Sequence, residues 1–140
     1  MNVIRARAMG MCFGVRDALR ATTKLADPGG VTIHGELVHN EAVIDDLSRR
    51  GFQMIPKGRR DRVPETPLVL ITAHGISRRE RSRLLGAGKS LVDATCPLVR
   101  HVQDAAVALQ RAGYFVIVLG RHNHVEVQGI IGDQIGRAHV

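Results

Sequence analysis

The hydrophobic residues of the chain follow two alternating patterns. Short continuous or alternating apolar runs are typical of strands, and apolar residues that recur every three or four positions are typical of helices with one buried face. The runs predict strands at residues 3–8, 31–34, 52–55, 68–71, 90–92 and 114–119. The wider spacing predicts helices at residues 15–25, 41–50, 77–85 and 97–112.

Strands that alternate with helices indicate an α/β fold, in which a parallel sheet carries helices on both faces. The continuous run at residues 68–71 suits a strand that is buried on both sides. A break near residue 96 separates a first domain, residues 1–95, from the start of a second at residues 96–134. We expect this second part to be incomplete, because one long helix and one strand cannot enclose a core.

The composition is that of a globular protein with a sizeable core, since 44% of the residues are hydrophobic. No segment approaches the roughly 18–20 consecutive apolar residues that a membrane-spanning helix needs, so no membrane partner is expected. The N-terminus lacks the apolar block of a secretory signal. Two cysteines are too few for a disulfide framework. A cytoplasmic location is therefore expected.

The net charge of +7 raises the question of a nucleic-acid partner. The chain has one Tyr, three Phe and no Trp, which are few aromatic rings for stacking on bases. Many of the arginines also fall in segments expected at the surface, such as residues 49–50, 57–62 and 78–83. We therefore expect a basic surface without a nucleic-acid partner. Attraction of an anionic substrate or an acidic protein remains compatible with this charge.

Chemically reactive side chains occur where predicted strands end or predicted helices begin. These residues are Cys12, His39, His74, Cys96, His124 and Glu126. The carboxyl ends of parallel strands share one edge of a sheet, which is where open α/β sheets bind ligands. Helix N-termini at this edge favour anions and lower the pKa of a thiol. The pattern predicts one site for an anion and a metal, with Glu126 beside His124 as a candidate proton donor.

Several interpretations of these residues stay open. A zinc site is one, although the C-x-x-C spacing of structural zinc sites is absent, and a cysteine nucleophile with a histidine base is another. A small metal- or anion-binding α/β module without redox activity is the main alternative function, and a basic nucleic-acid-binding domain is a second. Three further histidines are expected to be incidental: His34, His101 and His122. The first two lack a comparable loop setting, whereas the setting of His122 is compatible with either interpretation.

Five motifs resemble those of the 4-hydroxy-3-methylbut-2-enyl diphosphate reductases, the LytB-type iron–sulfur reductases of the methylerythritol phosphate route to isoprenoids. The motifs are GMCFGV (residues 10–15), GELVHN (35–40), TAHG (72–75), DATCPLV (93–99) and HVEVQG (124–129). The resemblance implies three similar α/β domains around a central 4Fe–4S cluster, which three cysteines hold. Cys12 and Cys96 match two of these ligands.

The resemblance also implies roles for the other residues. His39, His74 and His124 match histidines that bind the diphosphate substrate, and Glu126 matches the glutamate that delivers a proton. The implied reaction removes the substrate hydroxyl with two electrons and two protons and yields isopentenyl and dimethylallyl diphosphates. A ferredoxin or flavodoxin is the implied electron donor.

The chain departs from the family pattern at its C-terminal end. The third cysteine and the third domain are expected beyond residue 140, and residues 135–140 do not continue the family pattern, so a non-native tail is expected there. The 140-residue chain is accordingly expected to lack activity by itself.

Overall fold

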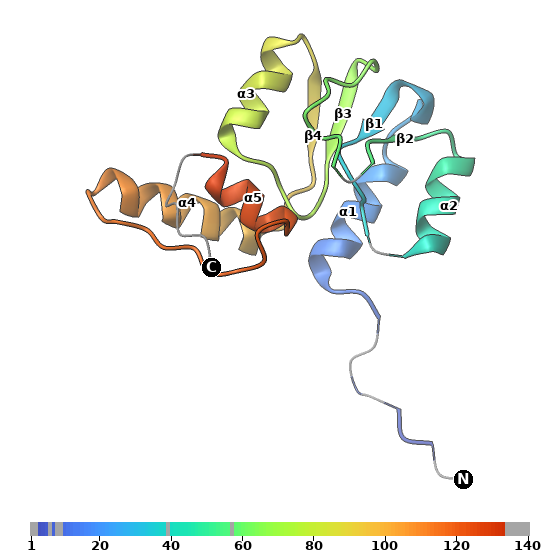
Figure 1. The fold of residues 1–140 in the computed structure, drawn as a ribbon. Helices are drawn as coiled ribbons and strands as arrows, with labels where there is room; N and C mark the ends of the chain where they lie inside the picture. Colours follow the sequence, from blue (N-terminus) through green and yellow to red (C-terminus); the bar gives the residue numbers. More distant parts are fainter. Residues whose placement is uncertain (1–2, 6, 8–9, 39, 57, 134–140) are drawn as a thin grey trace.

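A four-stranded parallel sheet forms the centre of the fold in the computed structural model, which describes residues 3–5, 7, 10–38, 40–56 and 58–133 (Figure 1). The strand order is β2-β1-β3-β4, with β1 at Val31–Ile33, β2 at Gln53–Met54, β3 at Leu68–Ile71 and β4 at Ser90–Asp93. All three pairings are parallel. The predicted α/β class is confirmed.

Among the described residues, five α-helices accompany the sheet. They are α1 at Phe13–Thr23, α2 at Glu41–Arg49, α3 at Arg78–Gly86, α4 at Pro97–Arg111 and α5 at Val125–Ile131, and a short 3₁₀ helix lies at Pro28–Gly30. In the described part of the chain, no helix combines the length and the hydrophobicity needed to cross a membrane.

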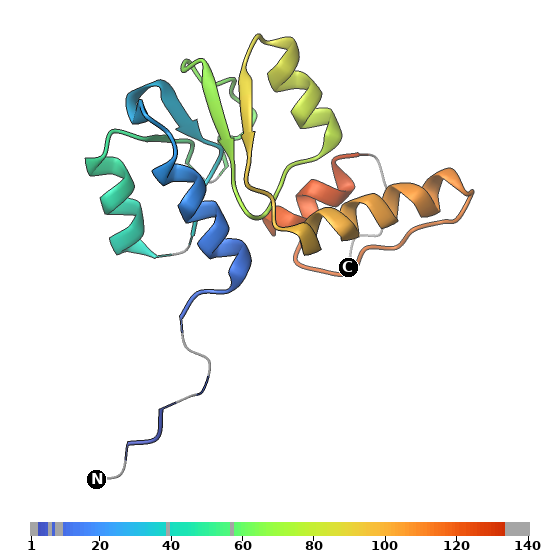
Figure 2. The same cartoon turned by 180° about the vertical axis from the view of Figure 1, so that it is seen from behind.

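Strand β3 divides the core into two apolar layers. Leu70 belongs to a buried cluster with Ala18 of α1 and Leu47 of α2. Its neighbours Val69 and Ile71 pack with Leu84 of α3 on the other face. Successive side chains of a strand point to opposite faces, so α1 and α2 cover one face and α3 covers the other (Figures 1 and 2). The result is a three-layer α/β arrangement.

The helix starts follow from local chemistry. The side chain of Asn40 accepts a hydrogen bond from the backbone N–H of Val43 at 3.2 Å, and Ser77 accepts one from the N–H of Glu80 at 3.1 Å. Both satisfy donors that a first helical turn leaves free. Pro97 begins α4, where a missing N–H costs nothing. These starts agree with the sequence prediction.

The predicted strand at residues 3–8 is wrong for the residues that are described there. Residues 3–5 and 7 are not in a strand, and the side chains of Val3 and Ile4 are 75% and 93% exposed. This segment leads away from the rest of the fold (Figure 1). An apolar run forms a strand only where a neighbouring strand pairs with its backbone, and these residues have no such neighbour in the described structure.

The predicted strand at residues 114–119 is also wrong, because this segment is irregular and mostly exposed. Helix α4 points away from the sheet, and the chain then returns along α4 (Figure 2). Val116 packs there against Ala106 and Val107 of α4, together with Ile130 of α5. The segment therefore lies against a helix, where no strand is available to pair with it.

Candidate functional site

The ends of β3 and β4 run side by side and bring two predicted site residues together. The N–H of Ala94 donates to the carbonyl of Ile71 at 3.0 Å, and the N–H of Cys96 donates to the carbonyl of Ala73 at 2.9 Å. Cys96 thus lies next to the residue that precedes His74. The shared carboxyl edge that the sequence predicted is present for this pair.

Asp93, the last residue of β4, organises the turn that carries Cys96. Its carboxylate accepts a hydrogen bond from the N–H of Thr95 at 2.9 Å. It also forms ion pairs with Arg81 of α3 and with Arg100 of α4, the latter at 2.9 Å. Burial alone would raise the pKa of Asp93, but the hydrogen bonds from Thr95 and Arg81 outweigh it and lower the pKa to about 2.

Sequence reasoning had assigned no role to Asp93. An aspartate at the end of a strand, three residues before a cysteine at a helix start, was a usable signal. The hydrogen bond between Asp93 and Thr95 could also have been inferred, because the two residues are close in the sequence. The ion pair with Arg81 could not have been inferred, because Arg81 lies on α3.

The two thiols occupy equivalent positions at the starts of two helices. Cys12 is the N-cap of α1 and Cys96 the N-cap of α4, and neither side chain caps its own helix. Cys12 is exposed and Cys96 is half-buried. Both cysteines thus precede a first helical turn, whose backbone N–H groups have no partner within the helix.

Gly14 brings the two cysteines into one neighbourhood. A Cβ atom at residue 14 would stand 2.9 Å from Sγ of Cys96, so any larger residue would displace this thiol. Cys96 therefore packs against the first turn of α1, two positions after Cys12. This contact explains why a glycine follows Cys12 so closely in the sequence.

The donor set suits a metal centre that is completed from elsewhere. Thiolates are the preferred ligands of iron–sulfur clusters and are also common on zinc. In the described residues, no group of three or more His, Cys, Asp or Glu side chains could hold a metal ion. Cys12 and Cys96 fit part of a thiolate ligand set.

His74, His124 and Glu126 form a second group at the same edge. Nδ1 of His74 lies 3.0 Å from Oε1 of Glu126. The rings of His74 and His124 approach edge to face, with 6.4 Å between their centroids. His124 is the N-cap of α5, and its Nδ1 accepts a hydrogen bond from the N–H of Glu126 at 3.4 Å. The side chains of His74 and Glu126 are 20% and 41% exposed, so a ligand in solvent can reach them.

The other histidines are distributed differently. The prediction for His39 lies outside the described residues. His101 and His122 are exposed. His34, for which no site role is expected, is fully buried, and its Nε2 lies 2.9 Å from Oε1 of Glu80. Helix α5, which positions His124 and Glu126, was also missed, because Val125 and Val127 alternate with polar residues as in a strand.

Comparison with known proteins agrees with this architecture. The sequence matches the family model described as "LytB protein" over residues 3–140. It is 35% identical to a 4-hydroxy-3-methylbut-2-enyl diphosphate reductase of Thermoanaerobacter sp. (strain X514), over 94% of this chain and 47% of that protein. It is 40% identical to the protein of the same name from Dehalococcoides mccartyi (strain CBDB1), over 94% of this chain and 46% of the relative.

A solved structure shares the fold. The E-1-hydroxy-2-methyl-but-2-enyl-4-diphosphate reductase from Plasmodium falciparum superposes with a TM-score of 0.77 at 31% identity, over 91% of this chain and 40% of that chain. The chain thus spans about half the length of the curated relatives it matches. With the family motifs collinear and the fold shared, the chain belongs to the LytB protein family.

Proposed function

We propose that this chain supplies part of the active site of a 4-hydroxy-3-methylbut-2-enyl diphosphate reductase. The reaction breaks the allylic C–O bond of the substrate and consumes two electrons and two protons. One proton leaves with the hydroxyl as water, and the other joins carbon to give isopentenyl or dimethylallyl diphosphate. The observation that carries the proposal is the His74–Glu126 pair, 3.0 Å apart, on the sheet edge that also carries Cys96.

Glu126 is the proposed proton donor. A carboxyl group can carry a proton to the leaving hydroxyl or to carbon, provided that a neighbour orients it. His74 provides this orientation through Nδ1, and the N-cap of α5 fixes the backbone of Glu126. The partial exposure of Glu126 leaves its carboxyl accessible to a substrate.

The histidines are the proposed diphosphate ligands. His74 and His124 present two imidazoles at a helix N-terminus, where N–H donors and the helix dipole favour phosphate oxygens. His39 belongs to the same proposal through its match to the family motif. A diphosphate held there would lie near Glu126.

Cys12 and Cys96 are the proposed ligands of a 4Fe–4S cluster. Such a cluster, when bound, supplies the two electrons one at a time. The chain contains two cysteines, so a further thiolate ligand has to come from outside these 140 residues. A small reduced carrier of the ferredoxin or flavodoxin class is the proposed electron donor, and a reducing cytoplasm is the proposed location, because it keeps the thiols available.

The domain boundaries remain part of this proposal, with residues 1–95 as one α/β unit and residues 96–134 as the start of another. Large apolar side chains are exposed on α4 and on the segment after it. They are Leu98, Val102, Leu109, Tyr114, Phe115, Ile117 and Leu119. An exposed apolar surface of this kind favours a covering partner. In the working enzyme we propose that a further α/β unit packs on it.

The ligand proposal is tested with a chimaera that joins residues 1–133 to the remainder of the Thermoanaerobacter reductase. Anaerobic reconstitution with iron and sulfide should give the broad visible absorption of an iron–sulfur cluster. Cys12→Ser and Cys96→Ser should each lose most of the iron, because a hydroxyl is a poor substitute for a thiolate. Glu65→Gln, an exposed site on a distant loop, is the control. A colourless protein that binds zinc stoichiometrically would instead support the non-redox metal module.

A further inference from the structure

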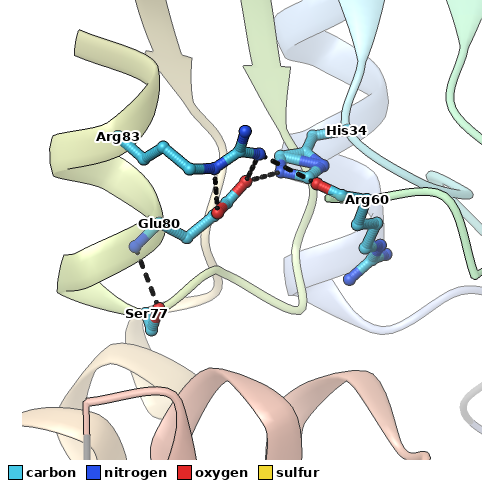
Figure 3. A network of polar contacts seen from close by, with 5 residues as sticks. All are labelled: His34, Arg60, Ser77, Glu80 and Arg83. Atoms are coloured by element: carbon cyan, nitrogen blue, oxygen red, sulfur yellow. Dashed lines mark hydrogen bonds and ion pairs between the residues drawn. The ribbon is translucent and has the colours of Figure 1, made fainter. Parts of the chain in front are cut away.

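A partly buried polar network connects the end of β1 with α3. It consists of His34, Glu80, Arg83 and Arg60, with Ser77 at the start of the helix (Figure 3). The imidazole of His34 is fully buried, and its Nε2 lies 2.9 Å from Oε1 of Glu80. The backbone N–H of His34 donates to the carbonyl of Leu70 at 2.9 Å, so the residue is fixed to β3 as well.

Arg83 extends the network to a third segment. Its Nη2 and Nε donate to the carboxylate of Glu80 at 2.6 and 2.8 Å, and Nη2 also donates to the carbonyl of Arg60 at 3.0 Å. The hydrogen bond to Glu80 raises the pKa of Arg83, although partial burial opposes this. Arg83 therefore links the Glu80 carboxylate, which His34 also contacts, to the segment that carries Arg60.

Arg60 closes the network against the loop that follows β1. Gly35 has φ +103°, and a Cβ atom there would collide with the guanidinium of Arg60. The guanidinium thus lies directly on the backbone of residue 35. A side chain at position 35 would break both the left-handed turn and this contact.

His34 acts in this network as a neutral donor. Burial, and next the positive charge of Arg60, lower its pKa to about 4. The ring is then uncharged at neutral pH, and its Nε2–H donates to Glu80. A neutral ring avoids the cost of an additional buried positive charge beside the two arginines.

The network bears on His74 through the start of α3. His74 lies shortly after β3, which ends at Ile71 and is fixed in the sheet. Only Gly75 and Ile76 separate His74 from Ser77, the N-cap of α3. The N–H of Gly75 donates to the carbonyl of Thr72 at 3.0 Å. With one end of this short loop fixed, the position of the first turn of α3 sets the other end of the loop. Glu80, in that turn, is the residue that His34 holds.

We propose that His34, Glu80, Arg83 and Arg60 form a brace that positions His74 against Glu126. The four residues are positioning residues, since they are proposed to act through the start of α3. The proposal rests on the proposed function in one respect: the imidazole that the brace positions is a proposed diphosphate ligand. The geometric part of the proposal is that the four residues link β1 rigidly to the loop that carries His74. This part does not depend on any ligand.

The geometric part is tested by NMR on the 140-residue chain, without any substrate. In the parent, Glu126→Gln should change the ¹⁵N shift of His74 Nδ1, because the partner of this nitrogen changes. In a His34→Leu background this change should fall below about half, because the first turn of α3 would no longer hold the His74 loop in place. His34→Gln, whose amide can donate to Glu80, should restore it. Glu65→Gln should leave it unchanged.

Equal shift changes in the parent and in folded His34→Leu would overturn the brace. If His34→Leu does not fold, Arg83→Met decides by the same measurement, because it removes the link between Glu80 and Arg60 from a less buried position. Loss of the coupling supports the brace, and its retention overturns it.

The link to binding is tested with inorganic diphosphate on the same variants. Folded His34→Leu should bind it about tenfold more weakly than the parent, and His34→Gln should bind like the parent. Equal affinities of parent and His34→Leu would refute a role of the brace in binding. A parent that does not bind diphosphate at all would count against the proposed function, while the NMR coupling still decides on the brace.

Discussion

Nδ1 of His74 lies 3.0 Å from Oε1 of Glu126, although 52 positions separate the two residues in the chain. His74 follows β3, and Glu126 lies in the first turn of α5, so this contact connects the sheet with the helix. A histidine that orients a partly exposed carboxyl group is a typical arrangement for proton transfer.

Replacement of Glu126 by glutamine tests this role. The amide keeps the size and a hydrogen-bonding oxygen but cannot deliver a proton. In the chimaera with the Thermoanaerobacter reductase, turnover should fall by about 10²-fold or more, whereas KM should change little. Steady-state kinetics with a reduced artificial electron donor measures both. A Glu126→Gln variant with near-parental turnover would show that the proton comes from another group.

Two variants of His124 separate its capping role from its proposed binding role. His124→Asn should keep a side-chain cap for α5 and therefore the melting temperature, because asparagine is a good N-cap. It should nevertheless bind inorganic diphosphate about tenfold more weakly, since one charge-assisted donor is lost. His124→Ala should lose the cap as well. Unchanged diphosphate affinity in His124→Asn would restrict His124 to capping.

Asp93 should contribute to stability in acid. Its pKa is lowered from 3.8 to about 2 in the folded chain, so its stabilising effect is complete above pH 3.8 and is lost as the pH falls toward 2. The shift corresponds to about 2 kcal/mol. Urea unfolding of Asp93→Asn should show a lower free energy of unfolding at pH 5 and a weaker decline between pH 4 and pH 2. A decline as steep as that of the parent would contradict this assignment.

His34 should make the fold sensitive to a milder range of pH. Its pKa is lowered from 6.5 to about 4, so the unfolded chain binds a proton more readily than the folded chain between these values. The parent should therefore lose about 3 kcal/mol of stability as the pH falls from 7 to 4. Urea unfolding of His34→Gln should lack this loss. Parallel pH profiles of the two proteins would show that His34 does not titrate in this way.

Features that depend on neighbouring residues were predictable from the sequence. The buried run that became β3, the caps Asn40 and Ser77, and the position of Cys96 before Pro97 all follow from local patterns. The strands expected at residues 3–8 and 114–119 are not formed by the described residues, because strand formation depends on a pairing partner elsewhere in the chain. A strand requires a partner, and the partner is not encoded in the run itself.

The candidate site likewise combines residues that local sequence patterns indicate with contacts that the sequence does not indicate. Cys12, His74, Cys96 and Glu126 were identifiable from loops and motifs. The long-range contacts around them were not, since Asp93 pairs with Arg81 and Arg100, and His34 is hydrogen-bonded to Glu80. Such pairs join residues that only the folded chain brings together. A buried histidine next to a glutamate cannot be distinguished from an incidental histidine before the helix that carries the glutamate is placed.

Turnover by the chimaera decides whether these 140 residues provide functional parts of a reductase site. Residues 1–133, joined to the remainder of the Thermoanaerobacter reductase and reconstituted anaerobically, should convert 4-hydroxy-3-methylbut-2-enyl diphosphate to isopentenyl and dimethylallyl diphosphates. The same chimaera with Cys96→Ser should not. A folded chimaera that contains its full complement of iron and sulfide, yet forms neither product, would contradict the account.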